Sequence, residues 1–183
     1  MANFAASSTA PVSAVDVIIP KAADVPALLA LVNALAAERN FLFMNPIDPV
    51  TGITILQRHL EAIAANGDEI VLVARDGREL VGLITGIRGT HCARRGAIDI
   101  GLGVLPGHRR RGIGHALLRG LERWALTAGC QRLQLRVMTL NTAAFALYRK
   151  CGFLVEGVYH ASAVVNGRYY DEFGMAKLIQ LAG

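Results

Sequence analysis

The segment that most restricts the fold is a β-rich run that leads into an arginine- and glycine-rich turn and then into an amphipathic helix. The run is Ala97–Val104, and the turn reads Arg109-Arg110-Arg111-Gly112-Ile113-Gly114. Apolar residues then recur at helical spacing from Ile113 to Ala125, and the helix is expected to end near Ala128-Gly129. A turn between a strand and a helix presents backbone N–H groups at the positive end of the helix dipole. The sequence therefore predicts an anion site here.

Two familiar phosphate-binding motifs do not fit this turn. Gly107 and Gly112 have the spacing of a Walker A loop, but Ile113-Gly114 stands where Lys and Ser/Thr are required. A dinucleotide fingerprint starting at Gly101 fails because Pro106 occupies the third glycine position. What remains is a turn in which Gly112 and Gly114 let a phosphate approach the backbone and the arginines supply charge. A pyrophosphate suits that geometry.

The rest of the chain alternates strands and helices in one continuous pattern. A strand is expected over residues 15–19, a helix after Asp24 as its N-cap, a proline-containing loop over residues 40–51 and a second helix beyond it. Asp76-Gly77 and Asn166-Gly167 each predict a hairpin, and a strand over residues 133–137 precedes a short helix from Asn141 to Lys150. The order β-α-α-β-β-β-α-β-α-β-β indicates a mixed α/β domain.

Length and composition set further bounds. The 183 residues suit one domain, expected over residues 15–183 behind a mobile tail at residues 1–14. No apolar run is long enough to span a membrane and no export signal is evident, so a cytoplasmic location is expected. Three scattered cysteines suggest neither disulfides nor structural zinc, and His108 and His115 lack metal-ligand spacing, so we expect no metal. The net charge of +5 is compatible with a polyanionic ligand, nucleic acid or an anionic membrane.

At the turn, the sequence resembles the GNAT superfamily of acyl-coenzyme A-dependent N-acyltransferases, whose signature is [Q/R]-x-x-G-x-[G/A] after a strand. The resemblance covers roughly residues 15–178 and is strongest over residues 99–157. Its other matching segments are Val104-Leu105-Pro106, Ala116-Leu117-Leu118, Asn141, Ala146-Leu147-Tyr148-Arg149-Lys150-Cys151-Gly152-Phe153, Glu156-Gly157, and Asn166-Gly167 to Asp171-Glu172 and Met175. These last segments look most like bacterial branches that acetylate amino acids, polyamines or protein N-termini. The resemblance implies a single mixed, mostly antiparallel sheet with a splayed central strand pair and about four flanking helices.

The resemblance also implies roles for individual residues. Acetyl-CoA would be the co-substrate, with its pantetheine arm on the strand ending at Val104 and hydrogen-bonded by Asn141. The pyrophosphate would lie on the turn, where the expected contacts are Arg109, Arg110, Arg111, Gly112, Ile113, Gly114 and His115. Tyr148 would protonate the departing thiolate, a role that its hydroxyl can fill at neutral pH. Asp99 would accept a proton from the amine, through water because Asp is shorter than the commoner Glu.

Plainer interpretations of these residues stay open at this stage. Tyr148 can be an ordinary aromatic of a helix face, and Asp99 an exposed strand residue. The primary amine can be an amino acid, a polyamine or a protein N-terminus, which residues 40–51 and 159–170 would decide. A noncatalytic acyl-CoA sensor is the alternative function. Nucleic-acid binding ranks low because no recognition helix or interleaving of aromatic and basic residues is visible. No membrane partner is expected, and a homodimer through the last strands is possible.

Overall fold

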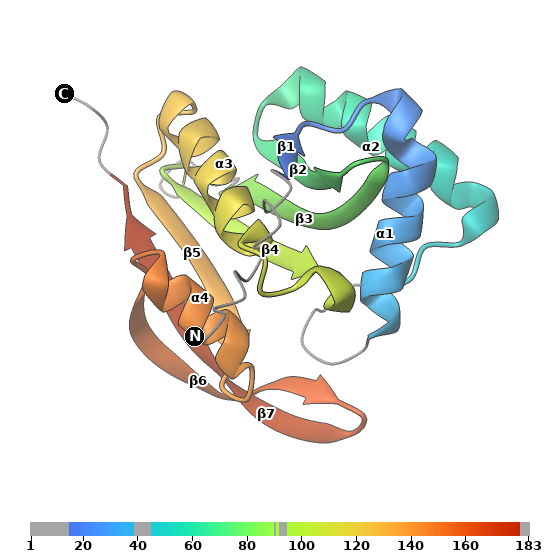
Figure 1. The fold of residues 1–183 in the computed structure, drawn as a ribbon. Coiled ribbons are helices and arrows are strands. Elements are labelled where there is room, and N and C mark those ends of the chain that lie inside the picture. Colours follow the sequence, from blue (N-terminus) through green and yellow to red (C-terminus); the bar gives the residue numbers. More distant parts are fainter. Residues whose placement is uncertain (1–14, 39–44, 90, 92–94, 180–183) are drawn as a thin grey trace, which may run out of the picture.

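A seven-stranded sheet with the order β1-β2-β3-β4-β5-β7-β6 organises the molecule (Figure 1). The computed structural model describes residues 15–38, 45–89, 91 and 95–179. The strands are β1 (Asp16–Ile18), β2 (Glu69–Asp76), β3 (Glu79–Arg88), β4 (Ala97–Val104), β5 (Arg132–Met138), β6 (Leu154–Val165) and β7 (Arg168–Leu178). The α-helices are α1 (Val25–Ala37), α2 (Pro49–Asn66), α3 (Ile113–Thr127) and α4 (Thr142–Lys150), and the short 3-10 turns are η1 (Ala22–Asp24) and η3 (Pro106–His108). The element order expected from the sequence is confirmed.

The helices cover the two faces of the sheet separately. On β2, Ile70 and Leu72 point into a core cluster with α3, whereas Val71 and Val73 point into a cluster with α1. Because both faces of β2 are buried, its sequence is continuously apolar rather than alternating. The clusters remove most large apolar side chains of the central strands from water, which is the main driving force for this arrangement. β6, in contrast, is a largely exposed edge strand.

Two details near α1 and α2 differ from the sequence expectations. Asp24 does not cap α1 through its side chain: one carboxylate oxygen accepts the Lys21 N–H at 2.8 Å and the other pairs with Arg75 at 2.7 Å. The expected loop over residues 40–51 is too long at its C-terminal end, because α2 begins at Pro49. Asp48 caps that helix by accepting the Val50 N–H at 2.7 Å. Residues 40–44 of this loop lie outside the described residues.

Every neighbouring strand pair is antiparallel except β4 and β5. This parallel pair lies at the centre of the sheet, with α3 and α4 on one face (Figure 1). The mixed, mostly antiparallel sheet predicted from the family resemblance is therefore confirmed. None of the helices in the described part of the chain combines the length and the apolar character that a membrane span requires.

Candidate functional site

The central feature of the site is the gap that opens between β4 and β5. The two strands pair only at Ala97↔Arg132, Ile98↔Leu133 and Asp99↔Gln134. Beyond this third pair they separate, although β4 continues to pair with β3 as far as Val104 (Figure 1). The Leu105 N–H donates to the Val81 carbonyl of β3. Along a strand, the main-chain N–H and C=O groups of successive residues point alternately toward one neighbouring strand and toward the other. The main-chain groups of Ile100 and Leu102 therefore point away from β3 and into the gap. An extended molecule carrying amide groups can hydrogen-bond to such an edge.

The turn that the sequence predicts to bind an anion lies where β4 ends and α3 begins. Arg110 and Gly112 have left-handed backbones, with φ of 65° and 81°, and α3 starts at Ile113. The first amide of α3 with an intrahelical partner is that of Ala116, which donates to the Gly112 carbonyl at 3.0 Å. The preceding amides are those that a helix leaves without intrahelical partners. A side chain at Gly112 would project into open space, so the glycine is needed for its backbone conformation and keeps the approach to these amides free.

The three arginines of the turn have different surroundings. Arg109 donates to the Val104 carbonyl at 2.9 Å and to the Glu38 carboxylate at 2.8 Å, so it joins the turn to the end of α1. Arg111 pairs with Asp76 of the β2–β3 hairpin at 2.8 Å. Arg110 is exposed and forms no ion pair within the described residues. Two of the three positive charges therefore have carboxylate partners among the described residues, whereas the charge of Arg110 has none.

The remaining residues of the turn contribute to packing. Ile113 is buried, and a side chain at Gly114 would approach the Leu147 Cδ2 of α4 to 2.8 Å, so Gly114 allows α3 and α4 to pack closely. His115 lines a pocket of about 220 Å³ between α3, α4 and β7. Arg119, Lys150 and Lys177 also line this pocket, and Glu122 pairs with Lys177, so the pocket is basic overall.

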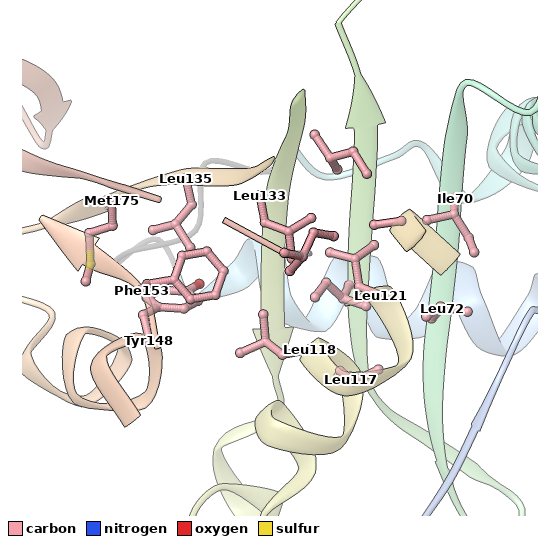
Figure 2. Close-up of a cluster of buried hydrophobic side chains, with 14 of the residues drawn as sticks. Ile70, Leu72, Leu117, Leu118, Leu121, Leu133, Leu135, Tyr148, Phe153 and Met175 are labelled. Atoms are coloured by element: carbon pink, nitrogen blue, oxygen red, sulfur yellow. The ribbon is translucent and has the colours of Figure 1, made fainter. Parts of the chain in front are cut away.

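α4 places Asn141 and Tyr148 on the side of the sheet that α3 covers. The Asn141 side-chain oxygen caps α4 by accepting the Ala144 N–H at 3.1 Å, which leaves its NH₂ group for another partner. Tyr148 is 6% exposed and its ring centroid lies 5.6 Å from that of Phe153 (Figure 2). Burial raises the pKa of the Tyr148 phenol, so the hydroxyl stays protonated and able to donate.

Asp99 lies on the opposite face of the sheet, at the last β4–β5 pair before the gap. Its neighbour Ile98 is fully buried under α3, so alternation turns Asp99 to the other side, where it is exposed. Gln134 donates from Nε2 to Asp99 Oδ1 at 2.9 Å and accepts from Arg132 Nε at 2.9 Å. The Arg132 contact fixes which way the amide points, because only the Gln134 oxygen can accept from a guanidinium. Arg132 also forms an ion pair with Glu156 of β6, and this contact lowers the pKa of the Glu156 carboxyl.

The structure thus distributes the sequence-predicted residues around one gap, with the turn at its open end, Asp99 at its vertex and α4 beside it. It also adds residues that the motif did not indicate: Gln134 and Arg136 on β5, and Tyr159 on β6. The sequence signal for the two β5 residues is the strict alternation of that strand, where Leu133, Leu135 and Val137 are buried. Polar residues in the alternate positions must share the face of Asp99.

Comparison with known proteins identifies the family of this fold and site. The model of the acetyltransferase (GNAT) family matches residues 37–153. This match spans more than half of the chain, so the protein belongs to the GNAT family, as the sequence resemblance indicated. Enzymes of this family are acyltransferases that use acetyl-CoA as the acyl donor.

Individual relatives agree with this assignment. An acetyltransferase, SG1711, of Sodalis glossinidius (strain morsitans) is 39% identical over 82 residues, which are 45% of this chain and 55% of that protein. This chain therefore spans about half the length of that curated relative. A GNAT-family acetyltransferase from Streptococcus pneumoniae has a TM-score of 0.84 at 26% identity, covering 91% of this chain and all (100%) of that one. A ribosomal-protein-alanine N-acetyltransferase from Brucella melitensis has a TM-score of 0.78 at 27% identity, covering 89% of this chain and 99% of the other.

Proposed function

We propose that this protein transfers an acetyl group from acetyl-CoA to a primary amine by direct attack of the amine on the thioester. The observation that carries the proposal is the β4–β5 gap, which pairs over three residues and then opens toward the turn before α3. The acyl donor fits this arrangement: the free edge of β4 can take the amides of pantetheine, and the α3 amides with Arg110 can take the pyrophosphate. The family assignment supports the same donor.

The two sides of the gap provide the two proton transfers that the reaction requires. A primary amine is mostly protonated at neutral pH and must lose a proton before it attacks. We assign this step to Asp99, acting through water, with Gln134 holding Oδ1 and leaving Oδ2 for the water. The new C–N bond forms as the C–S bond breaks, and the departing thiolate takes a proton from Tyr148. The second proton that the nitrogen loses on becoming an amide restores the Tyr148 hydroxyl through water. Holding the amine against the thioester lowers the activation barrier by on the order of 7 kcal/mol or more when the two groups are well aligned.

Binding and turnover test different parts of this proposal. Saturating acetyl-CoA should raise the melting temperature, because a ligand that binds only the native state stabilises it by mass action. Release of free thiol from acetyl-CoA, measured with a panel of amino acids, polyamines and N-terminal peptides, then tests transfer and the acceptor together. If saturating acetyl-CoA leaves the melting temperature unchanged, acetyl-CoA does not bind at this site. A shift without thiol release for any amine would instead favour the noncatalytic sensor.

The homodimer expected from the family resemblance stays a prediction. β6 is one of the two edge strands of the sheet, and it exposes Val155, Val158 and Val164. Such an edge is prone to pair with another chain unless it is covered. Light scattering of the purified protein would give its mass in solution, and a monomer at all concentrations would exclude the dimer.

A further inference from the structure

Arg136 lies on the face of the sheet that carries Asp99, beside the opening of the β4–β5 gap. It is two residues beyond Gln134 on β5, and the intervening Leu135 is buried on the opposite face. Alternation therefore places Arg136 and Gln134 side by side on one face, about 7 Å apart along the strand. Arg136 is exposed, so its guanidinium is available to a molecule bound at the gap.

A tyrosine and a glycine hold this guanidinium in position. Its central carbon lies 4.1 Å from the centroid of the Tyr159 ring of β6. The ring in turn lies across Gly174 of β7, where an added Cβ would approach its Cε2 to 2.7 Å. Gly174 is the register partner of Arg136, so the glycine makes the room that lets the ring reach the arginine across β7. Stacking of this kind favours a fixed orientation of the planar guanidinium and leaves its N–H groups free to donate.

None of the carboxylates around Arg136 in the described part of the chain forms an ion pair with it. Within the described residues Arg136 forms no ion pair, while Glu156 is engaged by Arg132 and Asp171 by His160 and the Ala161 N–H. Glu172, the buried carboxylate of β7, accepts from the Ser162 hydroxyl at 2.8 Å. The residues outside the described ranges contain no Asp or Glu. A preorganised guanidinium without an anionic partner suits a carboxylate, which it can bind through two parallel hydrogen bonds.

We propose that Arg136 binds the carboxylate of the acceptor, and hence that the preferred acceptor is a free amino acid rather than a polyamine. This inference rests on the proposed N-acetyltransfer. The amine would lie at the gap near Asp99 and the carboxylate of the same small molecule over β5, at Arg136. A polyamine has no group for the guanidinium, and its extra ammonium groups would be repelled by it.

The first test compares acceptors that differ in one charge. Thiol release is measured with the purified full chain, acetyl-CoA, the twenty free amino acids, their C-terminal amides, spermidine and a short peptide. For the best amino acid, kcat/KM should exceed that of its amide and of spermidine by about tenfold or more, the usual worth of a charge-assisted hydrogen bond. Amides, spermidine or the peptide performing as well as the acids would overturn the inference and leave N-acetyltransfer standing. Absence of thiol release with every amine would overturn both.

The second test assigns the preference to Arg136. Arg136→Gln should lower the acid-to-amide ratio of kcat/KM by about tenfold, mainly by raising KM for the acid. Arg136→Lys should recover only part of the ratio, because an ammonium group keeps the charge but loses the bidentate geometry and the stacking. Arg78→Gln, in the exposed β2–β3 turn, is the matched control and should keep the ratio of the unmodified protein. If Arg136→Gln leaves the acid-to-amide ratio of kcat/KM unchanged, another group binds the carboxylate.

Discussion

Gln134 donates to Asp99 Oδ1 at 2.9 Å across the last paired residues before β4 and β5 separate. Because Arg132 fixes the orientation of the Gln134 amide, the N–H can point only at the carboxylate. The contact therefore sets the direction of the second carboxylate oxygen, which is the one available to a water molecule. In this arrangement Gln134 is a positioning residue for the proposed base.

Replacing Gln134 by Leu should lower kcat by about tenfold, the worth of one hydrogen bond to a charged group, without changing KM for acetyl-CoA. Steady-state kinetics with the best acceptor measures both quantities. The Asp99→Ala/Gln134→Leu double variant should be no slower than Asp99→Ala alone, since the amide then has no base to position. If the two losses multiply instead, Gln134 acts independently of Asp99.

Gly112→Glu should abolish the thermal shift produced by acetyl-CoA, because the new carboxylate would lie at the proposed pyrophosphate site. Gly129→Glu is the matched control: Gly129 follows the other end of α3, also has a left-handed backbone, with φ of 70°, and also faces open space. Both variants carry similar backbone strain, so differential scanning fluorimetry with and without ligand separates strain from binding. A full ligand shift in Gly112→Glu would place the pyrophosphate elsewhere.

Most of the fold can be predicted from the sequence because its helices, strands and hairpins follow from patterns among residues that are close along the chain. Alternation along β5, the helical spacing after Ile113 and the hairpin dipeptides each depend on neighbouring residues, and the family signature places them on one sheet. The start of α2 was missed because Pro49 suggests a loop, whereas the Asp48 cap makes proline suitable for a first turn.

The site was predictable only in part, for a physical reason. A motif records residues that are close in sequence, but Arg109 meets Glu38 and Arg111 meets Asp76 through tertiary contacts. From the sequence alone the three arginines of the turn are therefore equivalent, whereas the structure distinguishes them. Arg136 and Tyr159 likewise meet only because Gly174, on a third strand, leaves room between them.

Arg110→Ala and Arg109→Ala should have separable effects. Arg110 has no ion-pair partner within the described residues, so its loss should weaken acetyl-CoA binding about tenfold with little change in melting temperature. Arg109 joins the turn to Glu38 and is half exposed, so its loss should cost up to about 1 kcal/mol of stability. Isothermal titration calorimetry and thermal unfolding measure the two effects. Equal loss of affinity in both variants would mean that Arg109 leaves Glu38 to bind the phosphate.

Tyr148→Phe should lower turnover by about 100-fold, the usual contribution of a general acid, with little change in acetyl-CoA affinity. No hydrogen bond to the Tyr148 hydroxyl is found within the described residues, so its removal should cost little stability at neutral pH. Steady-state kinetics and thermal unfolding at pH 7 test these points. Unchanged turnover would remove Tyr148 from catalysis.

The same variant should also alter the pH dependence of stability. Burial holds the pKa of Tyr148 in the folded protein above that of an unfolded tyrosine, which is about 10. Above about pH 10 the unfolded chain loses this proton while the folded protein keeps it, so the free energy of unfolding falls by up to about 1.4 kcal/mol per pH unit. Tyr148→Phe removes this contribution, and its stability should decline less steeply than that of the unmodified protein between about pH 10 and 11. Urea unfolding at pH 8, 10 and 11 measures the difference, and parallel declines would mean that the phenol titrates normally in the folded state.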